Sequence, residues 1–300
     1  MNQPLIEISG LAIDYPARRR LGGPRERIRV VEGVDLSLDA GQTLGLVGES
    51  GSGKSSIGQT LLGAVPPAAG RIRVAQWDVG ALRHRDLRAY RRTVQMVWQN
   101  PYASLTPTLP VGEQIGEPLR TDPGMDAAAR SRRVAQLLDQ VGLRAADAAK
   151  LPHQFSGGQR QRVAIARALA PSPRLIVLDE PVSALDVITQ AQILRLLEAV
   201  QRETRVAYLL ISHDIGVVRY LSDRVAVLRR GCLVESGDAD QVCERPAHAY
   251  TRELIGSILE PGPLEPLADE MSAGTPSRPG PSWGGTSVQG PVRQRGECPR

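Results

Sequence analysis

The sequence predicts an α/β protein built around a parallel sheet. Four short runs are almost wholly apolar, as central strands covered on both faces are. These runs are "TLGLV" (43–47), "VQMVW" (94–98), "LIVL" (175–178) and "YLLIS" (208–212). Longer segments with helical apolar spacing lie between and after them, at 125–143 and 187–203. A glycine-rich stretch follows the first run, at the point where such a sheet usually binds its ligand.

Two predicted hairpins and a helical insertion surround this sheet in the sequence. Residues 5–15 and 30–38 alternate well enough to predict an antiparallel hairpin, with a basic, solvated loop at 16–29. Residues from about 100 to 160 form a mostly helical insertion, and 224–237 form a second hairpin that turns at Gly231. We therefore expect one domain over 4–260.

The C-terminal stretch has a different composition. From residue 261 to 300, 15 of 40 residues are Pro or Gly, and apolar periodicity vanishes. Such a segment cannot bury enough apolar surface to fold alone, which predicts disorder.

Composition narrows the possible partners and location. A formal charge of +5 spread over 300 residues, with 3% aromatic residues, gives little reason to expect a nucleic-acid partner. No run approaches 18 uncharged apolar residues, and the N-terminus lacks a basic region followed by an apolar one. We expect neither a transmembrane segment nor a signal peptide.

The stretch "GESGSGKS" (48–55) fits G-x-x-x-x-G-K-[ST] between an apolar strand and a helical pattern. Lys54 is one of only two lysines in a chain that has 35 arginines, which indicates that this position needs a compact ammonium. Loop amides and the helix start would bind a β-phosphate, Lys54 would reach the β- and γ-oxygens, and Ser55 would ligate Mg²⁺. The predicted nucleotide-binding residues are Gly48, Glu49, Ser50, Gly51, Ser52, Gly53, Lys54, Ser55 and Ser56.

Polar residues follow the other three apolar runs. Asp179 and Glu180 follow one strand, as a magnesium-binding carboxylate and a carboxylate that polarises the attacking water would. Gln99 follows another and could touch both metal and water, and His213 follows the last and could bind a γ-phosphate. Because parallel strands end at one edge of a sheet, these groups predict a site for ATP and Mg²⁺.

The stretch "FSGGQRQRVAIARAL" (155–169) predicts a second anion-binding helix start. Ser156 and Gln159 are spaced as a capping box. Gly157 and Gly158 have no side chains to cover the backbone N–H groups, which an anion could then reach.

These motifs resemble those of the ATP-binding subunits of ABC transporters over residues 4–258. The resemblance implies an ABC-type fold: an α/β P-loop NTPase (RecA-like) core with an N-terminal antiparallel β subdomain and an α-helical subdomain. It matches residues 48–55 to Walker A, Gln99 to the Q-loop, and residues 156–159 to the signature. It also matches Asp179 and Glu180 to Walker B, Asp186 in "SALD" to the D-loop, and His213 to the switch histidine. Tyr15 is placed where an aromatic stacks on adenine, although packing alone would also explain it.

Four stretches are similar to the importer subgroup for dipeptides, oligopeptides and nickel complexes: "QMVWQNPYASLTP", "DEPVSALDV", "AQILRLLEAVQRE" and "ERPAHAYTRELI". This resemblance implies an ATPase that powers solute import from the cytoplasmic face of the membrane. Its implied partners are two membrane permeases, a second ATP-binding subunit (identical or paralogous) and an extracytoplasmic solute-binding protein. Peptide is the expected solute, with nickel or another metal chelate as the alternative. A non-transport ABC ATPase, or a module that holds ATP without turnover, fits the motifs less well.

Overall fold

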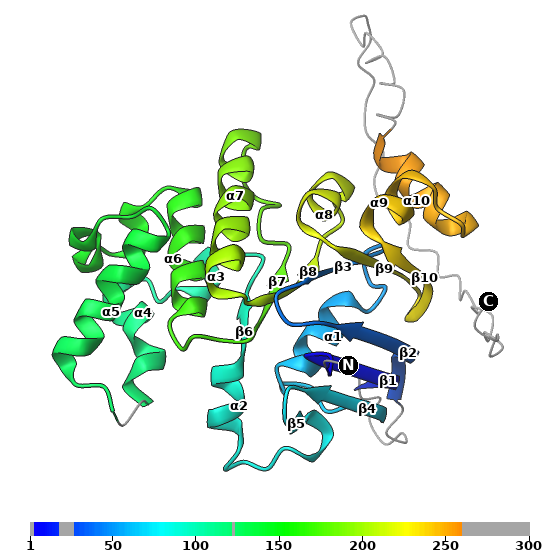
Figure 1. The fold of residues 1–300 in the computed structure, drawn as a ribbon, viewed down its shortest axis with the longest axis horizontal. Coiled ribbons are helices and arrows are strands. Elements are labelled where there is room, and N and C mark those ends of the chain that lie inside the picture. The colour runs from blue at the N-terminus through cyan, green and yellow to red at the C-terminus, as the bar shows by residue number, and fades with distance from the viewer. Residues whose placement is uncertain (1–2, 18–26, 122–123, 260–300) are drawn as a thin grey trace, which may run out of the picture.

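The computed structural model describes residues 3–17, 27–121 and 124–259, and these contain two sheets with helices around them (Figure 1). The first sheet is antiparallel, in the order β2-β1-β4-β5. Its strands are β1 (Ile6–Pro16), β2 (Arg27–Leu38), β4 (Ala69–Val74) and β5 (Trp77–Asp78). The predicted N-terminal antiparallel pair is therefore confirmed.

The loop between β1 and β2 is shorter than the sequence predicts. Residues 27–29 were expected in the basic loop, but they belong to β2. Pro16 is the partner of Arg27, and Tyr15 is the partner of Ile28, so strand pairing continues past the region of apolar alternation. Residues 18–26 of the expected loop lie outside the described residues.

The second sheet has the order β10-β9-β3-β8-β7-β6. Strands β6, β7, β8, β3 and β9 are mutually parallel, and β10 pairs antiparallel with β9. Their bounds are β3 (Thr43–Val47), β6 (Val94–Val97), β7 (Leu175–Asp179), β8 (Ala207–Ile211), β9 (Arg224–Arg229) and β10 (Cys232–Asp238). All residues of β3, β7 and β8 are buried, as the apolar runs predict. Trp98 and Ser212, which we expected inside strands, come directly after β6 and β8.

The β9–β10 hairpin turns at Gly231, as predicted. Gly231 has φ +87°, and a Cβ built there would lie 2.3 Å from the backbone oxygen of Val30. Only glycine allows the turn to pass so close to β2. The hairpin is therefore held against the antiparallel sheet.

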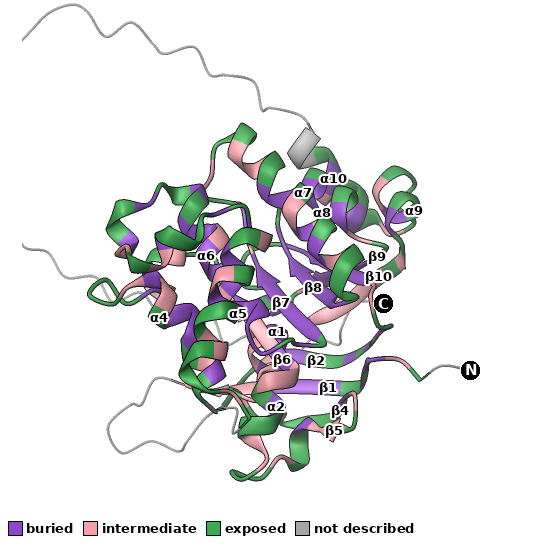
Figure 2. Ribbon diagram, turned by 60° about the vertical axis from the view of Figure 1, so that its left-hand side comes forward, coloured by how far each residue is buried: buried purple, intermediate pink, exposed green. Residues whose placement is uncertain are grey.

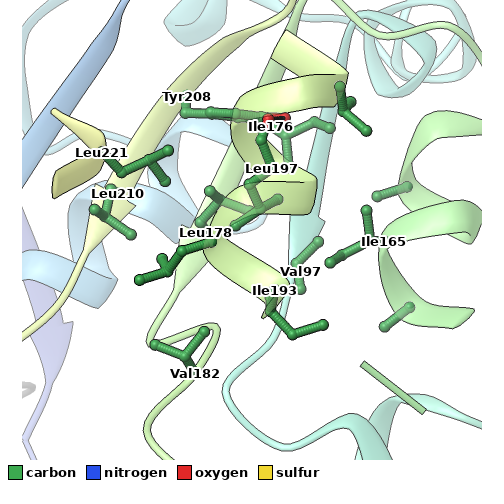
Figure 3. Packing of buried hydrophobic residues seen from close by; sticks show 14 of the residues in the cluster. Val97, Ile165, Ile176, Leu178, Val182, Ile193, Leu197, Tyr208, Leu210 and Leu221 are labelled. Carbon is green, nitrogen blue, oxygen red and sulfur yellow. Dashed lines mark hydrogen bonds between the residues drawn. The ribbon is translucent and has the colours of Figure 1, made fainter. Parts of the chain in front are cut away.

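Alternate residues of the central strands pack on opposite sides of the parallel sheet. Ile176 and Leu178 of β7 pack with Tyr208 and Leu210 of β8 and with helix α7 (Figure 3). Val177 and Leu209 belong instead to the cluster that contains α1 and the antiparallel sheet. Figure 2 shows the resulting layers, with buried strands between helices whose outer faces are exposed. The cover on both faces explains why β3, β7 and β8 are almost wholly apolar.

The helices cover both faces and form a separate helical lobe. The core helices are α1 (Lys54–Leu61), α2 (Leu87–Thr93), α6 (Gly157–Leu169), α7 (Val187–Thr204), α8 (Ile215–Leu221), α9 (Ala239–Glu244) and α10 (Ala249–Leu259), with the 3₁₀ turn η1 (Val79–Ala81). The lobe contains α3 (Pro101–Ser104), α4 (Val111–Gly116), η2 (Glu117–Thr121), α5 (Ala127–Gln140), η3 (Ala145–Ala149) and η4 (Pro152–Gln154). Figure 1 shows this lobe beside the β6 edge, opposite β10.

The helical lobe matches the insertion that the sequence predicts between about 100 and 160. Helix α5 buries Val134, Leu137 and Leu138, and it begins at Asp126, whose side chain accepts from the N–H of Ala129. The predicted disordered tail, 261–300, lies outside the described residues, and the domain limits of 4–260 stay a prediction. Within the described ranges, the structure contains no helix with the length and apolar character to span a bilayer.

Candidate nucleotide-binding site

The glycine-rich loop connects β3 to α1 and lies against neighbouring strands. Gly48 has φ +148°, and a Cβ there would lie 2.1 Å from the Leu228 carbonyl oxygen of β9. Gly53 has φ +104°, and a Cβ there would lie 2.8 Å from Val31 of β2. Side chains at these two positions would clash, so the loop can pass this close to the sheet only as glycine.

Lys54 is the first residue of α1, and the loop itself holds its ammonium. Its Nζ donates to the carbonyl oxygens of Gly48 at 2.7 Å and Glu49 at 2.8 Å, and to Ser52 Oγ at 3.3 Å. The side chain is buried, and burial lowers the pKa of Lys54 although nearby carboxylates, Glu180 first, oppose this. The loop thus keeps a desolvated cation beside its backbone.

Ser55 and Asp179 bring two oxygens together from different elements. Ser55 Oγ, in α1, donates to Asp179 Oδ1, at the end of β7, at 3.2 Å. Burial raises the pKa of Asp179, and the hydrogen bond from Ser55 partly offsets this. A hydroxyl and a carboxylate are hard oxygen ligands of the kind that Mg²⁺ prefers, and a buried carboxylate with a raised pKa gains from a bound cation. This pair fits a magnesium ion.

Glu180 and His213 form a hydrogen-bonded pair at the ends of β7 and β8. His213 Nδ1 lies 2.7 Å from Glu180 Oε1, and because a carboxylate only accepts, Nδ1 carries the proton. Glu180 has φ +48°, a left-handed conformation that is unfavourable for a non-glycine residue and is common at functional sites. Its second oxygen, Oε2, is buried and has no hydrogen-bond partner within the described residues. One carboxylate oxygen is thus held by His213, and the other is buried without a donor.

These groups share a single cavity of about 400 Å³. Of the residues that the sequence predicts, Ser50, Gly51, Gly53, Lys54, Ser55, Ser56, Gln99, Asp179, Glu180 and His213 line it. Val30 and Ile211 add apolar walls that the motifs did not predict. Val30 comes from the antiparallel sheet, and no local pattern in the sequence indicates that this strand closes the site.

Six predicted residues outside the glycine-rich loop lie elsewhere: Tyr15, Ser156, Gly157, Gly158, Gln159 and Asp186. Tyr15 packs in the antiparallel sheet, and its hydroxyl donates to Gln59 Oε1 at 3.1 Å, in agreement with the packing alternative for this residue. Asp186 begins α7 and accepts from the N–H of Thr189 at 2.9 Å. Ser156 and Gln159 form the predicted capping box at the start of α6, with Gly157 exposed there. Their roles in binding nucleotide stay predictions.

Comparison with known proteins identifies the class. The sequence profile of the ABC transporter family matches residues 31–183, and the profile of the oligopeptide/dipeptide transporter C-terminal region matches residues 234–280. The chain belongs to the ABC transporter family, which confirms the resemblance noted in its motifs.

The relatives include peptide-transport ATP-binding proteins. The chain is 46% identical over 259 residues to the oligopeptide transport ATP-binding protein OppD of Mycobacterium tuberculosis. The match covers 86% of this chain but only 42% of that protein. The chain is 43% identical over 266 residues to the di/tripeptide transport ATP-binding protein DppF of Pseudomonas aeruginosa, across 88% of this chain and 82% of that one. The chain is thus less than half the length of some relatives and close to the full length of others.

The fold is that of ATP-binding cassettes. A dimeric cassette in a post-hydrolysis state bound to ADP and Pi has a TM-score of 0.68 and 28% identity, and the match covers 78% of this chain and 98% of that one. The predicted α/β fold with its antiparallel and helical parts is therefore confirmed.

Proposed function

We propose that this chain binds ATP with Mg²⁺, hydrolyses it to ADP and phosphate, and thereby powers import of dipeptides or oligopeptides through partner permeases. The observation that carries the proposal is the cavity itself. Groups from four strand ends meet there, although Lys54 and His213 are 159 positions apart in the chain.

Lys54 would bind the triphosphate. Its three acceptors in the loop are neutral oxygens, so an anionic phosphate oxygen is a stronger partner for the buried ammonium. Since α1 begins without a side-chain cap, its first N–H groups are also available to phosphate oxygens. Ser55, Asp179 and Gln99 would hold Mg²⁺, which when bound offsets the charge of the phosphates.

Glu180 would act as the general base. Its Oε2 has no donor among the described residues, and it would accept a hydrogen bond from the attacking water once this buried oxygen is exposed to the cavity, while His213 holds Oε1. A carboxylate held on one side presents its other oxygen in a fixed direction, which favours proton transfer from a positioned water. The left-handed backbone of Glu180 supports this role, because strain of this kind is retained where the position of a side chain matters.

Exposed apolar residues support the two kinds of protein partner. Trp98 is 43% exposed and Tyr102 61%, and both lie where the Gln99 segment enters the helical lobe, as a permease contact would require. Val187 is 80% exposed and Ile188 74%, next to Asp186 at the start of α7. The second pair supports contact with another ATP-binding subunit, identical or paralogous.

The names of the relatives support a proposal for the solute, and the resemblance to importer subunits supports one for the cellular position. Relatives are named for oligopeptide transport, di/tripeptide transport and glutathione import, which favours a peptide solute over a metal chelate. We place the chain on the cytoplasmic face of the membrane, bound to two permeases that receive solute from an extracytoplasmic binding protein. We propose no nucleic-acid partner.

The experiment compares the wild type with Glu180→Gln. The variant keeps the shape of the side chain but cannot accept a proton, so kcat should fall by about 10²- to 10⁴-fold while the Kd for ATP stays within about twofold. Steady-state hydrolysis and calorimetric titration of the purified full chain measure these quantities. Equal turnover in the two proteins would remove Glu180 from the role of base. Uptake of labelled dipeptide by cells with the chain and its adjacent permeases tests the solute.

A further inference from the structure

The C-terminal helix contacts the phosphate-binding loop through one hydroxyl. Tyr250, in the first turn of α10, accepts a hydrogen bond from the backbone N–H of Glu49 at 3.2 Å. These two residues are 201 positions apart, and Tyr250 lies in the region that matches the oligopeptide/dipeptide transporter C-terminal profile. The site described above does not use this contact.

This hydrogen bond is one of two that fix the same peptide group of the loop. The carbonyl of Gly48 and the N–H of Glu49 belong to the same peptide, which is trans. Lys54 Nζ donates to this carbonyl at 2.7 Å, and Tyr250 accepts from this N–H at 3.2 Å. Because a trans peptide is planar and its two polar groups point in opposite directions, partners on both sides prevent its rotation.

Tyr250 is itself held firmly. Its side chain is 2% exposed, and the guanidinium of Arg229, the last residue of β9, lies 4.7 Å from its ring centroid. Burial raises the pKa of its hydroxyl, so the group stays neutral at physiological pH. Figure 1 shows α10 beside the β9–β10 end of the sheet.

The segment before α10 is tied to the same hairpin. Glu235 of β10 accepts from the N–H of Ala247 at 2.7 Å and from the N–H of His248 at 3.0 Å. A bidentate carboxylate of this kind fixes the start of the helix. The β9–β10 hairpin, α10 and the loop therefore form a connected structure that ends at the Gly48–Glu49 peptide.

We propose that Tyr250 is a positioning residue of the phosphate-binding loop, through which α10 sets the affinity of the loop for ATP. Without the hydroxyl, the Gly48–Glu49 peptide is held only by Lys54. The hydrogen bond from Lys54 is lost when its ammonium binds a phosphate instead. The cost of ordering the loop then reduces the free energy of ATP binding. This inference rests on the proposed nucleotide binding.

The test is Tyr250→Phe in the full chain, because it removes one hydroxyl and keeps the buried ring and its contact with Arg229. We expect the KM and the Kd for ATP to rise about three- to tenfold, which is the range for one lost hydrogen bond, with kcat within about twofold. Exchange of the Glu49 amide proton should accelerate. The control is Tyr220→Phe, which removes an exposed hydroxyl bound to Glu198 and should change neither quantity.

A second variant tests the connection to β10. Glu235→Gln removes the negative charge and one of the two carboxylate oxygens that accept hydrogen bonds at the start of α10. It should also raise the KM for ATP, by a smaller factor than Tyr250→Phe. An unchanged KM in Tyr250→Phe would overturn the inference, as would a loss of kcat and thermal stability with no separate effect on KM. If the wild type itself bound no ATP, the proposed function would fail first, so the two failures are distinguishable.

Discussion

The helix starts of α1 and α6 are both rich in glycine and serine, but they differ in how their first N–H groups are used. The N-cap residue of α1 is Gly53, which has no side chain to cap the helix. Helix α6 begins at Ser156, whose Oγ accepts from the N–H of Gln159 at 3.3 Å, while Gln159 Oε1 accepts from the N–H of Ser156 at 3.0 Å. One helix start is left open to a ligand, and the other is partly closed by its own side chains.

The charges beside the two helix starts differ as well. The first turn of α1 contains Lys54 and lines the cavity with Asp179 and Glu180. The first turn of α6 has no acidic residue, and Arg160 at its end is buried and donates to the carbonyl oxygen of Pro152. No residue of α6 lines that cavity. We therefore propose that a triphosphate binds at α1, and that the start of α6 adds donors to a nucleotide that is already bound, such as one presented by a second subunit.

Among the variants that test this comparison of α1 with α6, the largest effect is expected from removal of the cation at α1. Lys54→Ala should raise the Kd for ATP and lower turnover, together by about 10²- to 10³-fold, because a buried ammonium aimed at the phosphates is lost. Titration calorimetry and hydrolysis assays measure this change. The control is the other lysine: Lys150→Ala removes a partly exposed ammonium that pairs with Asp147 in the helical lobe. Comparable losses in both variants would mean that the effect of Lys54 is not local.

A smaller effect tests the anion-binding role of α6. Gly157 is exposed, and a Cβ there would meet Leu185 at an ordinary 3.5 Å, so the position accepts a side chain. Gly157→Asp suits a helix N-terminus but repels phosphate, whereas Gly157→Asn has nearly the same shape without the charge. We expect the Asp variant to hydrolyse ATP about tenfold more slowly than the Asn variant, at equal Kd for the isolated chain. Reduced binding to the isolated chain would contradict the comparison.

The smallest effect concerns the charge that α1 faces. Asp179→Asn removes a buried charge but keeps an acceptor for Ser55, so the nucleotide-free protein should melt about 2–4 °C higher at neutral pH. The pKa of Asp179 is raised in the folded protein, so its ionisation costs stability as the pH rises through that pKa. The gain should thus vanish as the pH falls below the ordinary aspartate pKa of 3.8. Melting curves with Mg·ATP should show a smaller ligand-induced shift for the variant. A gain that persists in acid would show that the charge is not its cause.

The sequence was sufficient to predict the features that short patterns carry. The apolar runs predicted four of the parallel strands, although β6 lies at the edge of the described sheet and is only partly buried. The polar residues after these runs predicted one cavity with Lys54, Gln99, Asp179 and His213 on its wall. This succeeded because a buried parallel strand must be apolar and must end at the same edge as its neighbours. The capping box at Ser156 succeeded for the same reason, since its partners are three residues apart.

Contacts between distant residues were decided only in the tertiary structure. Val30 closes the cavity, Glu180 takes a left-handed backbone and binds His213, and Tyr250 reaches Glu49 from the other end of the chain. Tyr15 packs in its sheet and donates to Gln59, a partner that strand alternation cannot reveal. Periodicity records which face of an element is buried, but not which element covers it. The motifs thus determined which chemical groups the site contains. Long-range packing determined how those groups are positioned and how firmly each is fixed.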